Sequence, residues 1–109
     1  MSDAFLARCR EITGAGFVLE GAAMAPYLTD WRGRYCGAAR CIVQPASTAE
    51  VAAVVAACAG AGAAVVPQGG NTSLCGGATP DGEGGAVIVC LARLNRIVAV
   101  DTKNDTISV

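Results

Sequence analysis

Histidine is absent from this sequence of 109 residues, and lysine occurs only once, as Lys103. Six cysteines are present, but no two of them form a CxxC pair. A zinc site would have to assemble from four thiolates with no such pair, so we expect no metal site and assign the thiols structural roles. The lack of a Gly-Lys-Ser/Thr sequence also excludes a Walker A phosphate loop.

Charged and aromatic side chains are scarce as well. Charged residues make up 16% and aromatic residues 5%, the net charge is −1, and the basic residues form no run. Nucleic-acid binding is therefore excluded, because the chain lacks a basic patch. Apolar residues reach 53%, which excludes a disordered tail and is high for a single free-standing domain. We therefore expect part of the surface to face another lobe or chain.

The longest apolar stretch, from Val51 to Val66, is bounded by Glu50 and Pro67. A membrane-spanning helix needs about 20 apolar residues, so this shorter stretch, which glycines interrupt, is not expected to span a membrane. We interpret it as a buried helix followed by a buried strand. The polar, acidic N-terminus (residues 1–3) does not resemble a secretory signal, and we expect a cytoplasmic chain with reduced thiols.

Residues 1–37 are expected to form a helical lead-in. Apolar side chains at helical spacing predict a helix over residues 3–13, which the following glycines would end. An extended piece is expected at 17–19, followed by a helical turn over 22–29. Residues 30–35 are polar and aromatic and are expected to be irregular.

Residues 38–109 are expected to form an α/β (α+β) domain with a small, largely parallel sheet and flanking helices. A β-type run over 40–44 precedes Ser47 and Glu50, which have the spacing of a capping box, and a helix should then run to about Gly60. A second buried strand over 63–66 would complete a βαβ unit with parallel strands and a right-handed crossover. The buried face of the helix should carry Val51, Val54, Val55 and Cys58.

Three more strands are predicted after this unit, at 86–91, after a bend within 94–100, and at 106–109. A polar turn over 101–105 separates the last two. Before them lies a glycine-rich loop, residues 67–85, within which Pro80-Asp81-Gly82 is interpreted as a plain turn.

The first part of this loop reads Pro67-Gln68-Gly69-Gly70-Asn71-Thr72-Ser73-Leu74-Cys75-Gly76-Gly77. Paired glycines let a backbone adopt positive φ and approach a ligand closely, and successive N–H groups can form a nest for an anion. Short polar side chains without a fixed cation suit a pyrophosphate. A surface loop that is rich in glycine only because it turns often remains an equal alternative. A Rossmann loop is excluded, because Gly60-Ala-Gly62 lacks the third glycine and precedes a strand.

The run PQGGNTSLCGGATP (67–80) resembles the pyrophosphate-binding loop of FAD-linked oxidases of the vanillyl-alcohol-oxidase/PCMH type. Similar segments are YLTDWRGRYCG (27–37), IVQPASTAEVAAVV (42–55) and LARLNRIVAVDTKNDTISV (91–109). The branch that it resembles comprises the glycolate oxidase D-subunit, D-lactate dehydrogenase and D-2-hydroxyglutarate dehydrogenase. The resemblance implies that 38–109 is the first lobe of a two-lobed FAD-binding domain and is incomplete at its C-terminus.

The resemblance also implies which residues hold the FAD diphosphate. They are Pro67, Gln68, Gly69, Gly70, Asn71, Thr72, Ser73, Leu74, Gly76 and Gly77. The glycines would give backbone access, Thr72 and Ser73 would donate hydroxyls, and Asn71 would fix the loop. The family usually has glycine where Ser73 stands, and Cys75 is also atypical and is expected to point inward. Arg32 is expected to brace the start of the first strand rather than to bind a carboxylate or phosphate.

By the same resemblance, the parent enzyme transfers a hydride from the α-carbon of a small 2-hydroxy acid to flavin N5 and releases a 2-oxo acid. The chain offers no catalytic residue and no histidine for a covalent flavin link. It is expected to be inactive alone and to need the rest of the FAD domain and a substrate domain. Two other functions stay open: a truncated module that forms homo-oligomers through its apolar face, and an anion-binding module with no preference for flavin.

Overall fold

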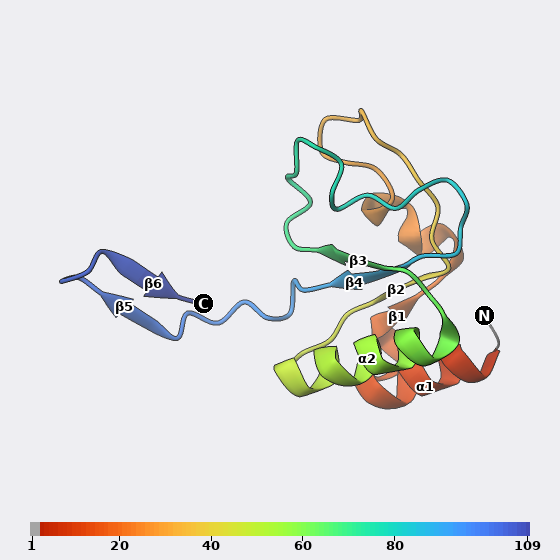
Figure 1. Ribbon diagram of the computed structural model, residues 1–109, viewed down its shortest axis with the longest axis horizontal. Coiled ribbons are helices and arrows are strands. Elements are labelled where there is room, and N and C mark those ends of the chain that lie inside the picture. Colours follow the sequence, from red (N-terminus) through yellow and green to blue (C-terminus); the bar gives the residue numbers. More distant parts are fainter. Residues whose placement is uncertain (1–2) are drawn as a thin grey trace.

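The computed structural model in Figure 1 describes residues 3–109, so the first two residues of the polar N-terminus lie outside it. A central sheet has the order β1-β2-β4-β3. Its strands are β1 (Val18–Leu19), β2 (Cys41–Val43), β3 (Val65–Gln68) and β4 (Val87–Cys90). Strands β2 and β3 both run parallel to β4, and β1 is antiparallel to β2. The predicted α/β class with a largely parallel sheet is confirmed.

Two helices, α1 (Asp3–Thr13) and α2 (Thr48–Ala61), lie side by side on one face of the sheet (Figure 1). The apolar positions of α1 fall at helical spacing, so they form a single face that packs into the core. Together the helices and the sheet form one apolar cluster: Phe5, Leu6, Cys9, Val18, Cys41, Val43, Val54, Cys58, Val87 and Val89.

The opposite face of the sheet is covered by a 3₁₀ helix, η2 (Gly21–Tyr27), which follows the short 3₁₀ helix η1 (Ala15–Phe17). Side chains alternate along a strand, so Ile42 and Ile88 point to this second face while their neighbours point to the helices. Both are fully buried. Strands β2 and β4 are thus covered on both faces, which explains their uninterrupted apolar sequences. The helical turn predicted at 22–29 is therefore present, but as a 3₁₀ helix.

The ends of α2 follow from local sequence. Ser47 Oγ accepts a hydrogen bond from the Glu50 amide at 3.2 Å, and the Glu50 carboxylate accepts one from the amide of Ala46. The helix ends at Ala61, close to the predicted end near Gly60, and Gly62 caps it with a φ of 67°, which suits a residue without a side chain. None of the described helices combines the length and apolar character that a membrane crossing requires.

Strand β3 differs from the prediction in position and in burial. It begins at Val65 rather than residue 63 and extends through Gln68, so it includes two residues assigned to the loop. The expected burial is wrong, because Val65 is exposed and Val66 only half-buried. The reason is that β4 lies between β2 and β3 and leaves β3 as an edge strand. Val55, predicted to face the core, is also exposed, at 43%.

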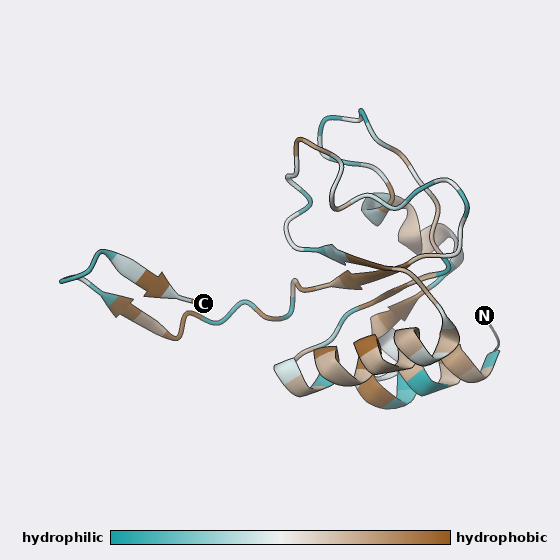
Figure 2. Cartoon of the chain, viewed as in Figure 1, coloured by the Kyte–Doolittle hydropathy of each residue, from teal (hydrophilic) through white to brown (hydrophobic). Residues whose placement is uncertain are grey.

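A hairpin of β5 (Ala99–Asp101) and β6 (Thr106–Ser108) extends away from the sheet (Figure 1). The strand predicted after a bend within 94–100 is β5, which begins only at Ala99. Val100 lies opposite Ile107, and Val98 donates a backbone hydrogen bond to Ser108. Since residues two apart share a face, these valines and Ile107 point to the same side. Figure 2 shows the apolar colouring of both strands, which no described element covers.

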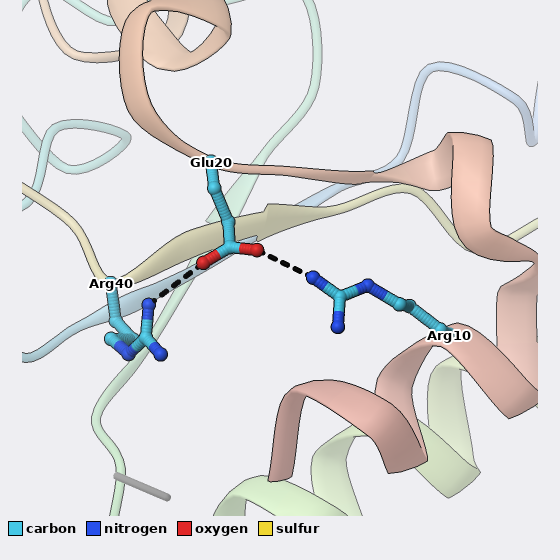
Figure 3. A network of polar contacts seen from close by, with 3 residues as sticks. All are labelled: Arg10, Glu20 and Arg40. Carbon is cyan, nitrogen blue, oxygen red and sulfur yellow. Dashed lines mark hydrogen bonds and ion pairs between the residues drawn. The ribbon is translucent and has the colours of Figure 1, made fainter. Parts of the chain in front are cut away.

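A three-residue ion cluster ties α1 to the residues that directly precede η2 and β2 (Figure 3). Glu20 accepts from Arg10 at 2.5 Å and from Arg40 at 3.0 Å. The three side chains are between 28% and 40% exposed, so solvent screens the pairs and their net stabilisation is small, on the order of 1 kcal/mol. The cluster is thus best understood as fixing where the chain enters β2.

Candidate functional site

The glycine-rich loop leaves the carboxyl end of β3, and we call its first part, residues 69–77, the cradle. The side chain of Gln68 closes its base. Gln68 is 2% exposed, and its Nε2 donates to the carbonyl oxygens of Tyr27 at 2.9 Å and of Ala78 at 3.0 Å. These bonds join the two ends of the cradle and connect them to η2. The Gln68 side chain therefore holds the loop and is not free to contact a ligand.

Asn71 fixes the middle of the cradle, as predicted. Its Nδ2 donates to the Thr29 carbonyl oxygen at 2.7 Å, and its backbone has a φ of 56°. Asparagine tolerates this left-handed conformation better than most residues. The positive φ expected at Gly69 and Gly70 occurs instead at Asn71 and Gly76.

Gly69 and Gly70 have a different role in the structure. A Cβ atom at Gly69 would meet no protein atom within 4 Å, and one at Gly70 would meet only the Thr72 methyl, at 3.9 Å. No part of the chain thus requires glycine here. Missing side chains at two consecutive positions leave the backbone open to a ligand from outside.

The segment 27–37 forms the outer wall of the cradle. Asp30 is buried, and its Oδ1 accepts from the amides of Arg34 at 2.7 Å and Tyr35 at 3.0 Å. This turn places the Trp31 indole within 2.9 Å of the Thr72 carbonyl oxygen. It also places the Tyr35 ring against Gly76, where an added Cβ would approach ring atoms to 3.1 Å.

The bracing role predicted for Arg32 belongs to Asp30. Arg32 is exposed and makes no hydrogen bond or ion pair with any residue from 3 to 109; its guanidinium carbon lies 6.0 Å from the centre of the Trp31 ring. Sequence reasoning missed Trp31 and Tyr35 as parts of the site. Their partners lie about 40 positions away in the sequence, and no local pattern indicates such a contact.

The backbone amides of the cradle are unusually free. Among the described residues, no amide from 69 to 77 donates to a protein acceptor, and the hydroxyls of Thr72 and Ser73 are also unbonded. Ser73 does not have a positive φ, so its backbone has no need of the glycine that is usual there. Unpaired N–H groups around open glycines, with no acidic side chain among them, match the donor set that a diphosphate requires.

The thiols divide into two groups. Burial raises the pKa of Cys41 to about 12 and that of Cys58 to about 11, and it also raises the pKa of Cys9. These three are therefore protonated core side chains, as predicted. Cys75 was expected to point inward but is exposed, because residues 74 and 75 lie on the solvent side of the cradle. No cluster of three or more metal-ligating side chains occurs within residues 3–109.

A family model described as "FAD binding domain" matches residues 39–109 of this chain. Among curated proteins, the chain is 41% identical over 75 residues to the probable mitochondrial D-2-hydroxyglutarate dehydrogenase of Oryza sativa subsp. indica. That match covers 69% of this chain and 13% of the rice protein. The chain is also 34% identical to glycolate oxidase subunit GlcD of Bacillus subtilis over 68 residues, which are 62% of this chain and 14% of that protein.

Solved structures show the same fold. An alkyldihydroxyacetonephosphate synthase matches 94% of this chain and 21% of its own chain, with a TM-score of 0.78 and 20% identity. A p-cresol methylhydroxylase matches 91% of this chain and 20% of its own, with a TM-score of 0.72 and 24% identity.

The match to this chain spans only about a seventh of the length of the rice and Bacillus relatives. The rice protein is named as mitochondrial, so the cytoplasmic location stays a prediction.

Proposed function

The chain belongs to the FAD-binding domain family that matches residues 39–109, and we propose that its residues 67–77 hold the diphosphate of FAD within a larger flavin-dependent oxidoreductase. One observation carries this proposal: the amides of residues 69–77 have no acceptor in the described chain and surround two glycines with open space above them. A diphosphate spreads its charge over several oxygens, so many dipolar donors can bind it without a lysine.

Each residue of the predicted site then has a specific task. Gly69 and Gly70 admit the phosphate oxygens to the backbone, and Thr72 and Ser73 add hydroxyl donors. Asn71 and Gln68 act on the loop itself, since their amide groups are hydrogen-bonded to carbonyl oxygens. Pro67, Leu74, Gly76 and Gly77 complete the backbone path. When bound, FAD supplies an acceptor for a hydride.

We propose a small 2-hydroxy acid as the substrate of the parent enzyme, which would be oxidised to a 2-oxo acid. The names of similar proteins support this, since they include D-2-hydroxyglutarate dehydrogenases and a D-lactate dehydrogenase. No carboxylate, histidine or lysine lies among residues 67–77. The chain alone would therefore bind the cofactor at most, and substrate contacts would come from other parts of the parent enzyme.

A titration of FAD into the purified chain, followed by flavin fluorescence, tests the proposal. The double variant Gly69→Val/Gly70→Val should lose saturable binding, because branched side chains would occupy the open space above the amides. It should keep its fold, because no protein atom lies close to either position except the Thr72 methyl. Gly82→Val is the matched control, since Gly82 lies in the same loop, outside the cradle, also with nothing within 4 Å.

Equal binding by the double variant and the control would refute the diphosphate assignment. Inorganic pyrophosphate is titrated in parallel. If it competes with FAD and the adenosine and flavin moieties add no affinity, the chain is an anion-binding module without preference for flavin. If neither ligand binds to the wild-type chain, the same titration is made on a longer chain that includes the following part of the FAD domain. Binding there means that residues 67–77 form half of the site, and no binding means that they form none of it.

The hairpin favours self-association as a second candidate. Val98, Val100 and Ile107 are each more than half exposed and lie on one face. A two-stranded hairpin with an uncovered apolar face is marginal in water, so a second copy of the chain could cover it. Sedimentation equilibrium tests this directly: a monomer at concentrations near 1 mM would exclude the candidate, and replacing Val100 and Ile107 by threonine should abolish any dimer that forms.

A further inference from the structure

The only tryptophan of the chain, Trp31, is 61% exposed, yet its indole nitrogen has a well-defined partner in the cradle. Its Nε1–H donates to the carbonyl oxygen of Thr72 at 2.9 Å, between residues 41 positions apart. Burial of the ring does not account for this position, because most of the ring faces solvent. The hydrogen bond to the loop is the specific interaction that the side chain makes.

This bond determines the direction of the next amide. The C=O and N–H groups of a trans peptide point in opposite directions within one plane, and all described peptide bonds are trans. With the Thr72 oxygen held toward the indole, the Ser73 N–H must point away from Trp31. That N–H has no acceptor among the residues described, so it is free for a ligand.

The turn beneath Trp31 is rigid enough to hold this geometry. The Gly33 amide donates to the Asp30 carbonyl oxygen at 3.0 Å, and Gly33 adopts a φ of 70°. The buried carboxylate of Asp30 accepts the amides of Arg34 and Tyr35. Three interactions thus fix the backbone on either side of Trp31. The backbone that carries the indole is thus held by its own turn and does not depend on the cradle for its place.

We infer that Trp31 is a positioning residue, which orients the Ser73 amide toward the diphosphate of FAD; this rests on the function proposed above. Trp31 acts on the peptide between Thr72 and Ser73 and does not itself bind the cofactor. Without the indole donor, this peptide is free to rotate, and its carbonyl oxygen can turn toward the anion. A carbonyl in that position repels a phosphate, so the loss should be at least that of one hydrogen bond.

The test compares Trp31→Phe with Phe17→Tyr in the full 109-residue chain. Phenylalanine keeps an aromatic ring at position 31 but has no N–H. Phe17→Tyr is the matched control, because it also exchanges one aromatic ring for another at a partly exposed position, and Phe17 lies in η1, outside the cradle and its wall. FAD affinity is measured by fluorescence titration, and urea unfolding checks that both variants keep the wild-type stability.

The second readout is the HNCO cross-peak of Ser73, which reports the Ser73 N–H and the Thr72 carbonyl carbon in one signal and needs no ligand. We expect it to move in Trp31→Phe and to stay in place in Phe17→Tyr. FAD binding should weaken about tenfold in Trp31→Phe, as for the loss of one hydrogen bond, and remain unchanged in the control.

Wild-type FAD affinity in Trp31→Phe, or weaker binding with an unmoved Ser73 cross-peak, would overturn the inference. The second result would mean that the indole acts by stacking or by general stability. If the wild-type chain binds no FAD, the longer chain described above decides the proposed function, and the cross-peak alone decides whether Trp31 orients the Ser73 amide.

Discussion

Gly37 is the position where one added methyl group should do most damage to the candidate site. A Cβ atom at Gly37 would lie 1.9 Å from the carbonyl oxygen of Pro80 and 2.6 Å from that of Asp81. Both contacts are with backbone, which no side-chain rotation can relieve. The neighbouring Ala38 amide donates to Asp81 at 2.7 Å, so the clash falls at the junction between the two loops that form the site.

The magnitude follows from the geometry of this contact. Ordinary van der Waals contact would require the two backbones to separate by roughly 1.5 Å. Such a shift breaks the Ala38 hydrogen bond, which costs about 1 kcal/mol, and adds the 1–3 kcal/mol typical of overpacking. We therefore expect Gly37→Ala to lower the free energy of unfolding by about 2–4 kcal/mol, a large part of the roughly 5–15 kcal/mol of a small domain.

Urea unfolding followed by circular dichroism measures this loss. Gly60→Ala is the matched control: Gly60 lies within α2, nothing lies within 4 Å of its Cβ position, and alanine should stabilise the helix by about 1 kcal/mol. The two glycine-to-alanine changes should thus have opposite signs. A Gly37→Ala variant within about 0.5 kcal/mol of wild type would refute the close approach of the two loops.

Three further predictions concern the helix cap and the thiols. Ser47→Ala should cost about 1 kcal/mol in urea unfolding, because the Glu50 amide loses its acceptor, whereas Ser47→Asp should retain the cap. The pKa of Cys41 rises from 9.0 to about 12 on folding, so the unfolded chain releases this proton first. The free energy of unfolding should therefore fall between pH 9 and 12, by up to about 1.4 kcal/mol per pH unit. In Cys41→Ala this fall with pH should be smaller, and an unchanged fall would contradict the raised pKa of Cys41. Iodoacetamide should label the exposed Cys36 and Cys75 in the native chain at pH 8 and reach Cys41 only after unfolding, as read by mass spectrometry of the peptides.

Local sequence predicted the elements whose ends depend on local chemistry. The spacing of Ser47 and Glu50 located the start of α2, and a glycine pair located its end to within two residues. The apolar run before Leu91 identified β4, which is buried on both faces. The glycine-rich loop was placed after β3, where it also lies in the structure. Each of these signals acts over a few residues, so the rest of the fold does not change it.

The failures share a different cause. β3 and β4 have similar apolar sequences, yet one is an exposed edge strand and the other is central. Only the order of strands in the sheet separates them, and that order depends on contacts between distant segments. The wall of the cradle was missed for the same reason, since Asn71 and Trp31 each find their partners about 40 residues away. Local propensity carries no information about such pairs.

The side chains around the cradle bind carbonyl oxygens and leave its amides free. Gln68, Asn71 and Trp31 all donate to carbonyl oxygens, either of the loop or of the segment 27–37. Each bond satisfies an acceptor without using a backbone N–H. The carbonyl oxygens of Thr72 and Ala78 are therefore bound by side chains, while the amides of residues 69–77 keep no acceptor in the described chain. A loop built in this way favours an anion without a cationic side chain, because its polarity comes from the fixed orientation of peptide groups. The glycines provide access, and at the peptide between Thr72 and Ser73 the neutral donor of Trp31 holds the carbonyl oxygen away from a ligand that meets the Ser73 amide.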